Sequence, residues 1–261
     1  MVMTKYESYK KEVLEASLWL SAQGYFGSLR GSGGNVSVRI NETDMAITPS
    51  GVRYQEIFAA DICVVGSDVS VIEGNDKLKP SVEAGMHSII YQRRPDVRAI
   101  VHTHQTYGSV FALINTPIPA LFDEVSFALG QIVEIIPYAL SGSPELVNNV
   151  AGKLSNNANA YIIQNHGILA LGKNLDKAIL NAELLEKVAH IYYLALSTGK
   201  AVDTLPESIT DFVAMIRNQE VKEAMQKKQE KKHKSLWGHT RRFGIAKMND
   251  RRIYSNLGLW N

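Results

Sequence analysis

Cysteine is almost absent from this sequence, which has a single cysteine in 261 residues. One thiol cannot form a disulfide within the chain, so no intrachain disulfide is available to the fold. Cys63 stands in the apolar stretch Ile62–Val65, where we expect a small buried side chain in a strand. Long apolar runs are also missing, and none approaches the roughly 18 residues that suggest a membrane helix. We therefore expect no membrane association.

The amino-terminal segment lacks the apolar core of a signal peptide, and we expect a cytoplasmic protein. Internal repeats and linker-like low-complexity segments are absent as well. Hydrophobic residues make up 45% of the chain, charged residues 21%, and the mean hydropathy is −0.10. These values are ordinary for a globular protein with a substantial core. The length suits one large domain or two small ones.

The charge of the chain is uneven, although the net charge is only +2. Residues 221–252 contain eleven Lys and Arg against three Asp and Glu, which is +8 and leaves −6 for the remainder. A basic tail can bind nucleic acid or an acidic surface. Nothing in it resembles a nucleic-acid-binding motif, so we expect a solvated helix or a tail that covers a neighbouring subunit. We treat residues 209–261 as a basic helical extension of the domain formed by residues 1–208.

Helical and strand patterns alternate along the chain, which predicts one α/β domain whose sheet is covered by helices. The expected helices cover residues 4–23, 82–93, 108–114, 145–154, 175–197 and 209–232. The expected strands cover residues 35–40, 45–48, 62–65, 69–72, 97–102, 132–138 and 160–171, the last as a strand pair or a bent strand.

Two histidines, His102 and His104, follow an apolar strand over residues 98–101. Side chains alternate between the faces of a strand, so these imidazoles point the same way and lie about 7 Å apart. Two imidazoles placed like this can share one metal ion. The carboxyl end of a strand is also where α/β proteins tend to place their sites.

A third histidine, His166, follows the apolar strand 160–163 and precedes Gly167. We expect this glycine to permit the sharp turn that aims the imidazole into the site. Three histidines with an open fourth position are a recurring form of catalytic zinc site. Imidazole suits zinc, although manganese or iron can substitute. The sequence therefore predicts one zinc ion per chain.

An acid, Glu83, stands in the first turn of the helix expected at 82–93. Its position leaves open whether it is a surface acid favoured by the helix dipole or a catalytic group. Glycine-rich turns and a helix N-terminus offer N–H groups and hydroxyls that together suit a phosphate, although each alone is more often an ordinary turn. These phosphate candidates are Gly34, Asn35, Ser50, Gly51 and Ser81. The segment 167–173 approaches a P-loop spacing, but Asn174 stands where Ser or Thr is required, so we reject it.

Six segments together resemble the class II aldolase/adducin family. They occur in the family's order and spacing, between about residue 8 and about residue 200. The segments are Gly33–Ser37, Thr48–Gly51, Lys79–Glu83, Arg94–Asp96, His102–His104 and Asn165–Gly167. The resemblance implies a single three-layer α/β/α domain over residues 1–208, with a mostly antiparallel or mixed sheet. It also implies a ring-shaped homotetramer with active sites between subunits.

The resemblance also assigns roles to residues. His102, His104 and His166 would hold zinc, and Glu83 would be the acid/base beside it. Gly34, Asn35, Ser50, Gly51 and Ser81 would hold the substrate phosphate. The sequence departs from the family's aldolases at Val82, where they have a second serine, and at Asp123, which aligns with a tyrosine donated across the subunit boundary. Glu124 falls near a carboxylate that epimerase and dehydratase members use for acid/base work.

We therefore expect zinc-dependent retro-aldol cleavage of a small phosphorylated ketose to dihydroxyacetone phosphate and an aldehyde. The metal would act as a Lewis acid, Glu83 would move the proton at carbon, and Glu124 or Asp123 the proton on the C4 oxygen. A sugar-phosphate 4-epimerase, a dehydratase and a sugar-acid phosphate decarboxylase remain alternatives, because they share this metal site. An adducin-like scaffold without chemistry is a remote alternative. The identity of the sugar stays open.

Overall fold

The computed structural model describes residues 5–28 and 30–248, with side chains as far as residue 230. By internal contacts the chain divides into two units, Met1–Val221 and Lys222–Asn261. The first unit contains every described strand and the candidate site. The division of the chain at residue 208 stays a prediction, and residues 249–261 of the expected extension lie outside the described part.

A nine-stranded sheet forms the centre of the first unit, in the order β4-β3-β2-β1-β5-β9-β8-β7-β6. Among the described strands only β7 and β8 pair in parallel, so the sheet is mixed and mostly antiparallel, as expected. The strands are β1 (Asn35–Arg39), β2 (Met45–Ile47), β3 (Cys63–Val65), β4 (Val71–Glu73), β5 (Ala99–Thr103), β6 (Ile118–Pro119), β7 (Ile132–Ile136), β8 (Ala160–Ile163) and β9 (Gly167–Gly172).

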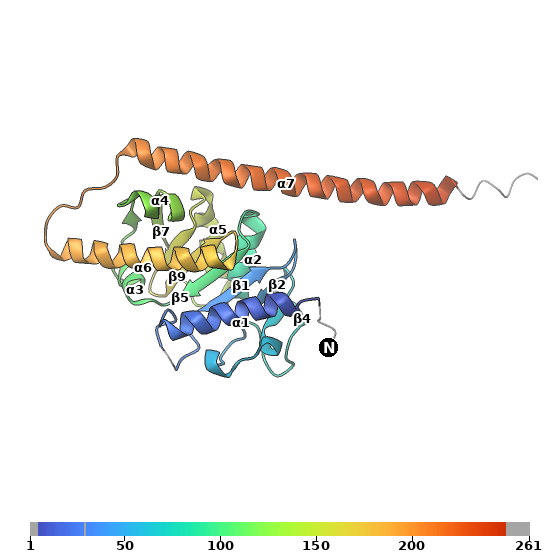
Figure 1. The fold of residues 1–261 in the computed structure, drawn as a ribbon, viewed down its shortest axis with the longest axis horizontal. Coiled ribbons are helices and arrows are strands. Elements are labelled where there is room, and N and C mark those ends of the chain that lie inside the picture. Colours follow the sequence, from blue (N-terminus) through green and yellow to red (C-terminus); the bar gives the residue numbers. More distant parts are fainter. Residues whose placement is uncertain (1–4, 29, 249–261) are drawn as a thin grey trace, which may run out of the picture. The chain divides into compact units, whose positions relative to one another are not determined.

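Helices cover both faces of the sheet, which gives the expected three-layer arrangement (Figure 1). Alternate side chains of the strands enter two separate cores, and the burial of both faces explains why most strand residues are apolar, with the polar residues of β1 as an exception. Helices α1, α3, α4 and α6 share one core, and α2 and α5 share the other. The α-helices are α1 (Glu7–Ala22), α2 (Ala84–Arg93), α3 (Thr106–Ile114), α4 (Asp123–Leu129), α5 (Pro144–Lys153), α6 (Leu175–Ser197) and α7 (Glu207–Met248). Short 3-10 turns cover Tyr54–Glu56, Ala59–Asp61 and Leu154–Asn156.

Side-chain caps explain where several helices begin. The Ser143 hydroxyl accepts from the Leu146 amide at the start of α5, at 3.2 Å, and the next residue is proline. The Asn174 side chain accepts from the Lys177 amide at the start of α6, at 2.9 Å. These bonds satisfy amides that have no partner within the helix.

The structure differs from the sequence expectations in the stretch between α3 and β7. No element was expected there, yet it forms β6 and the seven-residue α4. The acidic first turn and the spacing of Val125 and Leu129 before Gly130 were usable signals for α4, but a two-turn helix gives a weak pattern. The expected strand pair at 160–171 is confirmed as β8 and β9, and buried Cys63 lies in β3 as expected.

Helix α7 starts near its predicted position, but its backbone stays helical as far as Met248 rather than ending near residue 232. Its first turns belong to the first unit, where Val213 and Val221 are buried. The Arg217 guanidinium donates to the carbonyl of Ala128 at 2.7 Å and to that of Phe127, at the end of α4. None of the helices in the described part of the chain is long and apolar enough to cross a membrane.

Candidate metal and catalytic site

His102 lies on β5, which pairs with β1 on one side and β9 on the other. Its side chain is fully buried, and its Nδ1 lies 2.7 Å from the carbonyl oxygen of Ile168. A carbonyl only accepts, so Nδ1 carries the proton and Nε2 presents a lone pair. A histidine held in this way by a backbone carbonyl is oriented as metal-ligating histidines usually are.

His104 follows β5 and is held by the loop after α1. Its amide donates to the Tyr25 carbonyl at 2.9 Å, and its Nε2 lies 3.1 Å from the Nε2 of His102. Two nitrogens bound to one tetrahedral zinc at the usual bond length would lie about 3.3 Å apart. The observed separation therefore fits two ligands of one ion.

His166 lies in the turn between β8 and β9. The left-handed residue of this turn is Asn165, with φ 54°, and not Gly167 as expected from the sequence. Gly167 is required for another reason. A Cβ there would lie 2.4 Å from the Thr103 carbonyl oxygen and 2.6 Å from the His104 ring, so only a hydrogen leaves room for the histidines.

The three imidazoles converge, with one ligand nitrogen from each lying within 4.8 Å of the others. The ring centroids are 4.8 to 5.3 Å apart. Burial lowers the pKa of His102, and burial together with the neighbouring His102 and His166 lowers the pKa of His104 to about 3. Burial thus favours the neutral form of both imidazoles, which is the form that binds a metal ion. The donor set suits zinc, or another divalent cation that accepts imidazole.

Glu83 lies in contact with the triad. It is the N-cap residue of α2 and is buried, and its two carboxylate oxygens lie 3.2 Å from His102 Nε2 and 3.1 Å from His166 Nε2. The Asn35 side-chain amide donates to the same carboxylate at 2.7 Å. Burial raises the pKa of Glu83, but His102 and the hydrogen bonds from His166 and Asn35 outweigh it, so the pKa lies well below its usual range. The carboxylate is thus ionised beside the place where a cation would be held.

Two segments that carry phosphate candidates, around Ser50 and Ser81, lie side by side. Thr48 and Ser50 are joined to the segment 79–81 by three backbone contacts: the Pro49–Pro80 bridge, Ser50 to the Lys79 carbonyl, and Ser81 to the Thr48 carbonyl. Asn35 is paired with His102 across β1 and β5, and Gly34 precedes it with φ +69°. The segment rejected as a P-loop begins as β9, which agrees with that rejection.

Asp123 and Glu124 lie elsewhere, exposed in the first turn of α4. The Glu124 carboxylate pairs with Lys187 of α6 at 3.4 Å. Within the described part of the chain, no hydrogen bond or ion pair joins either acid to the three histidines. A role for them in catalysis therefore stays a prediction.

Two residues near the site were missed from the sequence as functional candidates. Ser141 places its hydroxyl 3.4 Å from His166 Nε2, and no sequence signal marked it. His87 is fully buried, and its Nδ1 lies 2.7 Å from the Ser37 hydroxyl. Its signal was its place one helical turn after Glu83.

The chain is similar to known aldolases in sequence and in fold. The family model "Class II Aldolase and Adducin N-terminal domain" matches residues 11–193. A 5-deoxy-D-ribulose 1-phosphate aldolase of Bacillus thuringiensis is 37% identical over 182 residues, which is 69% of this chain and 83% of that protein. An L-fuculose phosphate aldolase of Escherichia coli is 34% identical over 201 residues, covering 77% and 86%. A solved L-fuculose 1-phosphate aldolase superposes with a TM-score of 0.73 at 36% identity, covering 80% of this chain and 95% of that one.

Proposed function

The chain belongs to the class II aldolase and adducin family, and we propose that it is a zinc-dependent aldolase acting on a small phosphorylated ketose. The products would be dihydroxyacetone phosphate and an aldehyde. The observation that carries the proposal is the convergence of three histidines with one carboxylate in contact with two of them. The relatives named above are aldolases of 5-deoxy-ribulose 1-phosphate and of fuculose phosphate, which supports a short ketose 1-phosphate as substrate.

His102, His104 and His166 would hold the ion, which supplies positive charge to stabilise the charge that develops on the sugar oxygens when the C3–C4 bond breaks. The neighbouring residues then decide where protons go. In the direction of condensation, ionised Glu83 accepts the proton from C3 of dihydroxyacetone phosphate. In the direction of cleavage it returns that proton to the same carbon, so the overall reaction is balanced.

The phosphate would lie on the edge formed by Gly34, Asn35, Ser50, Gly51 and Ser81. Backbone amides and hydroxyls at turns and helix N-termini suit an anion. Val82, which is 62% exposed, offers no hydroxyl to it. The cradle therefore makes fewer contacts with the phosphate than one with a second serine.

The proton on the C4 oxygen needs a second acid/base group, and we assign it to Asp123 or Glu124 of a neighbouring subunit. Both acids are exposed on α4 and so are available to another copy of the chain. This assignment requires a homo-oligomer with shared sites, and the family resemblance implies that it is a tetramer. Light scattering with size-exclusion chromatography gives the assembly directly, and a monomer with full activity would contradict it. A cytoplasmic location stays a prediction.

One purified sample tests the function. Metal content by inductively coupled plasma analysis is paired with detection of dihydroxyacetone phosphate from a panel of ketose 1-phosphates. We expect about one zinc per chain and release of triose phosphate. Bound zinc without cleavage would shift the function to an epimerase, a dehydratase or a decarboxylase. A chain that binds no metal after reconstitution would contradict the proposal.

A further inference from the structure

Three polar side chains of β1 point toward α2 on the face that carries His102. They are Asn35, Ser37 and Arg39, which alternate along the strand as residues of one face must. All three are buried, with exposures of 3%, 0% and 6%. Each one bonds to α2 or its flanking residues, so a row of polar contacts runs along the helix.

Successive residues of this row contact successive turns of α2. Asn35 binds the Glu83 carboxylate, Ser37 binds His87 and Tyr91, and Arg39 binds the carbonyls of Tyr91 and Arg94. Two residues of a strand span about 6.7 Å, and four residues of a helix span about 6 Å. The two repeats nearly match, so the row fixes the position of α2 along β1.

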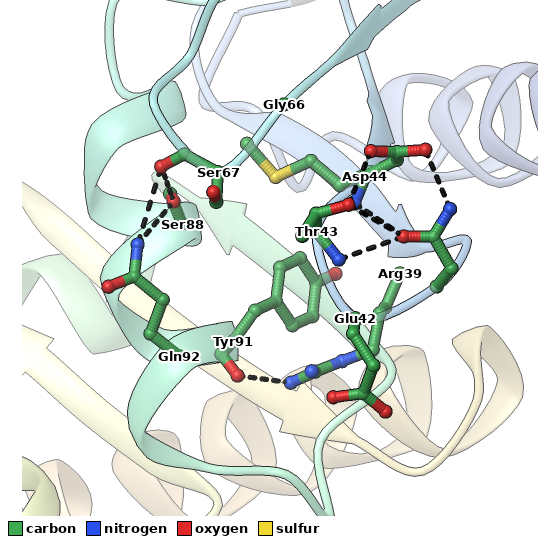
Figure 2. Close-up of a pocket in the computed structure, with 11 residues that line it drawn as sticks. Arg39, Glu42, Thr43, Asp44, Gly66, Ser67, Ser88, Tyr91 and Gln92 are labelled. Carbon is green, nitrogen blue, oxygen red and sulfur yellow. Dashed lines mark hydrogen bonds between the residues drawn. The ribbon is translucent and has the colours of Figure 1, made fainter. Parts of the chain in front are cut away.

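The far end of the row is anchored by Arg39. Its guanidinium donates to the carbonyls of Tyr91 at 2.5 Å and of Arg94 and Val97, each at 2.9 Å. Figure 2 shows the Arg39 guanidinium bonded to the Tyr91 carbonyl, with both residues lining a small pocket beyond the end of the row. This end of α2 is therefore held by its carbonyl groups, which a helix C-terminus leaves without partners.

Within α2, His87 is the residue nearest to Glu83 whose side chain bonds to β1. The Tyr91 hydroxyl donates to the Ser37 carbonyl at 3.1 Å, so the Ser37 hydroxyl donates to Tyr91 at 2.8 Å. The Ser37 oxygen then accepts from His87 Nδ1 at 2.7 Å. The His87 amide in turn donates to the Glu83 carbonyl at 3.2 Å, which connects the backbone of Glu83 to this chain of bonds.

His87 is also close enough to the site to respond to its charges. Burial lowers the pKa of His87 to about 3, His102 lowers it further, and Glu83 opposes the change. The ring is thus neutral. Its Nε2 has no hydrogen-bond partner in the part of the chain whose side chains are described. The bond from Nδ1 to Ser37 is therefore the hydrogen bond of this ring in the part of the chain whose side chains are described.

We propose that His87 is a positioning residue for Glu83: its bond to Ser37 holds the first turn of α2 against β1 and so sets where the carboxylate meets the histidines. Asn35 binds the carboxylate but leaves the helix backbone free, and Arg39 acts three turns away. The effect of His87 on turnover rests on the proposed function. Its effect on the position of the first turn of α2 does not, because that effect concerns the helix alone.

The test compares His87→Ala, His87→Asn and His87→Gln in the zinc-loaded full chain. We expect His87→Ala to lower kcat about tenfold to a hundredfold with KM and zinc content nearly unchanged, because a small displacement of a catalytic group has effects of that size. In His87→Asn the side-chain amide takes the place of Nδ1, so kcat should return to near the wild-type value. In His87→Gln the amide takes the place of Nε2, so kcat should stay as low as in His87→Ala. Ser88→Ala is the matched control, since Ser88 is the next residue but bonds to the Ser67 carbonyl at 2.6 Å.

Amide hydrogen exchange in residues 84–88 supplies a readout that needs no activity. Exchange there should rise about tenfold in His87→Ala, return in His87→Asn and stay at the wild-type rate in Ser88→Ala. Unchanged kcat and exchange in His87→Ala would overturn the proposal, as would recovery by glutamine and not by asparagine. A wild-type chain that binds zinc but cleaves no ketose phosphate would contradict the proposed function only, and the exchange data would still decide the role of His87.

Discussion

Gly167 leaves space for the histidines, so a side chain at this position should disturb the site. A Cβ would meet the Thr103 carbonyl and the His104 ring at distances real Cβ atoms do not show. We expect Gly167→Ala to displace His104 and to weaken zinc binding at least about tenfold, as losses of metal-site geometry do. Competition with a zinc-chelating dye measures the affinity. Gly152→Ala is the control, because a Cβ at that helical position meets nothing within 4 Å.

Glu83 is the residue on which the proposed chemistry depends. Glu83→Gln keeps the shape and the bond to Asn35 through its amide oxygen but cannot take up a proton. We expect zinc binding and folding to be retained while kcat falls about 10²- to 10⁴-fold. Steady-state assays with metal analysis decide this, with exposed Glu56→Gln as control. Near-normal turnover in Glu83→Gln would remove it from the mechanism.

His87 predicts a pH dependence of stability in the metal-free protein. Its pKa falls from 6.5 to about 3 on folding, so between these values the unfolded chain holds a proton that the folded chain lacks. Stability from this residue is complete above pH 6.5 and is lost as the pH falls toward 3, by about 1.4 kcal/mol per pH unit. The free energy of unfolding, measured with urea between pH 7 and pH 4, should therefore fall less with pH in His87→Asn than in the wild type. Equal pH slopes for the two proteins would show that His87 is not held neutral.

The residues of the site differ in how far the sequence predicts them. The histidines are predictable, because strand alternation places His102 and His104 together and the apolar strand marks His166. The packing requirement for Gly167 is not predictable, because it depends on contacts with Thr103 and His104, which another strand brings close. His87 has the same difficulty: helical spacing relates it to Glu83, but its partner Ser37 is brought to it only by packing of β1 against α2.

At the scale of elements, helices α4 and α7 are joined by the hydrogen bonds of Arg217 and by the edge-to-face ring contact of Phe127 with Phe212. Arg217 is 13% exposed and donates to two carbonyls at the end of α4. We expect Arg217→Ala to lower the free energy of unfolding by about 1.5–3 kcal/mol, because hydrogen bonds that involve a charged group contribute that much. Chemical denaturation measures it. Arg53→Ala removes a guanidinium that is 57% exposed and should change stability by under about 0.5 kcal/mol.

The long periodic helices were predicted within a few residues, because many turns repeat the same pattern. Short elements were not, since α4 and β6 have too few residues to establish a period. The end of α7 was also missed, because a charged helix without an apolar face gives no pattern at its end. Packing therefore determines the elements that local sequence leaves undecided.

At the scale of the molecule, the compact first unit ends at Val221, within α7. A chain that stops after residue 225 should keep its thermal midpoint within about 2 °C. One that stops after residue 206 should lose about 10 °C, because it loses buried Val213 and Val221 together with the Arg217 bonds. Differential scanning calorimetry compares the two. An equal loss in both would show that residues beyond 225 stabilise the first unit.

An α/β domain with a helix-covered sheet could be predicted because strand and helix patterns alternate, and the family resemblance implied the three layers. The order of the strands could not, since β1 pairs with β5 and β5 with β9 across long stretches of chain. The sequence marks each strand separately but holds no local signal for which strands become neighbours.

The convergence of the histidines also has a consequence for folding kinetics. His102 and His166 are far apart in the chain and meet only after β9 has paired with both β5 and β8. Contacts of such long sequence separation require a large loop to close and tend to form late. A metal ion bound at this site would therefore not guide the early steps of folding. It would act afterwards, by slowing the separation of strands that have already paired.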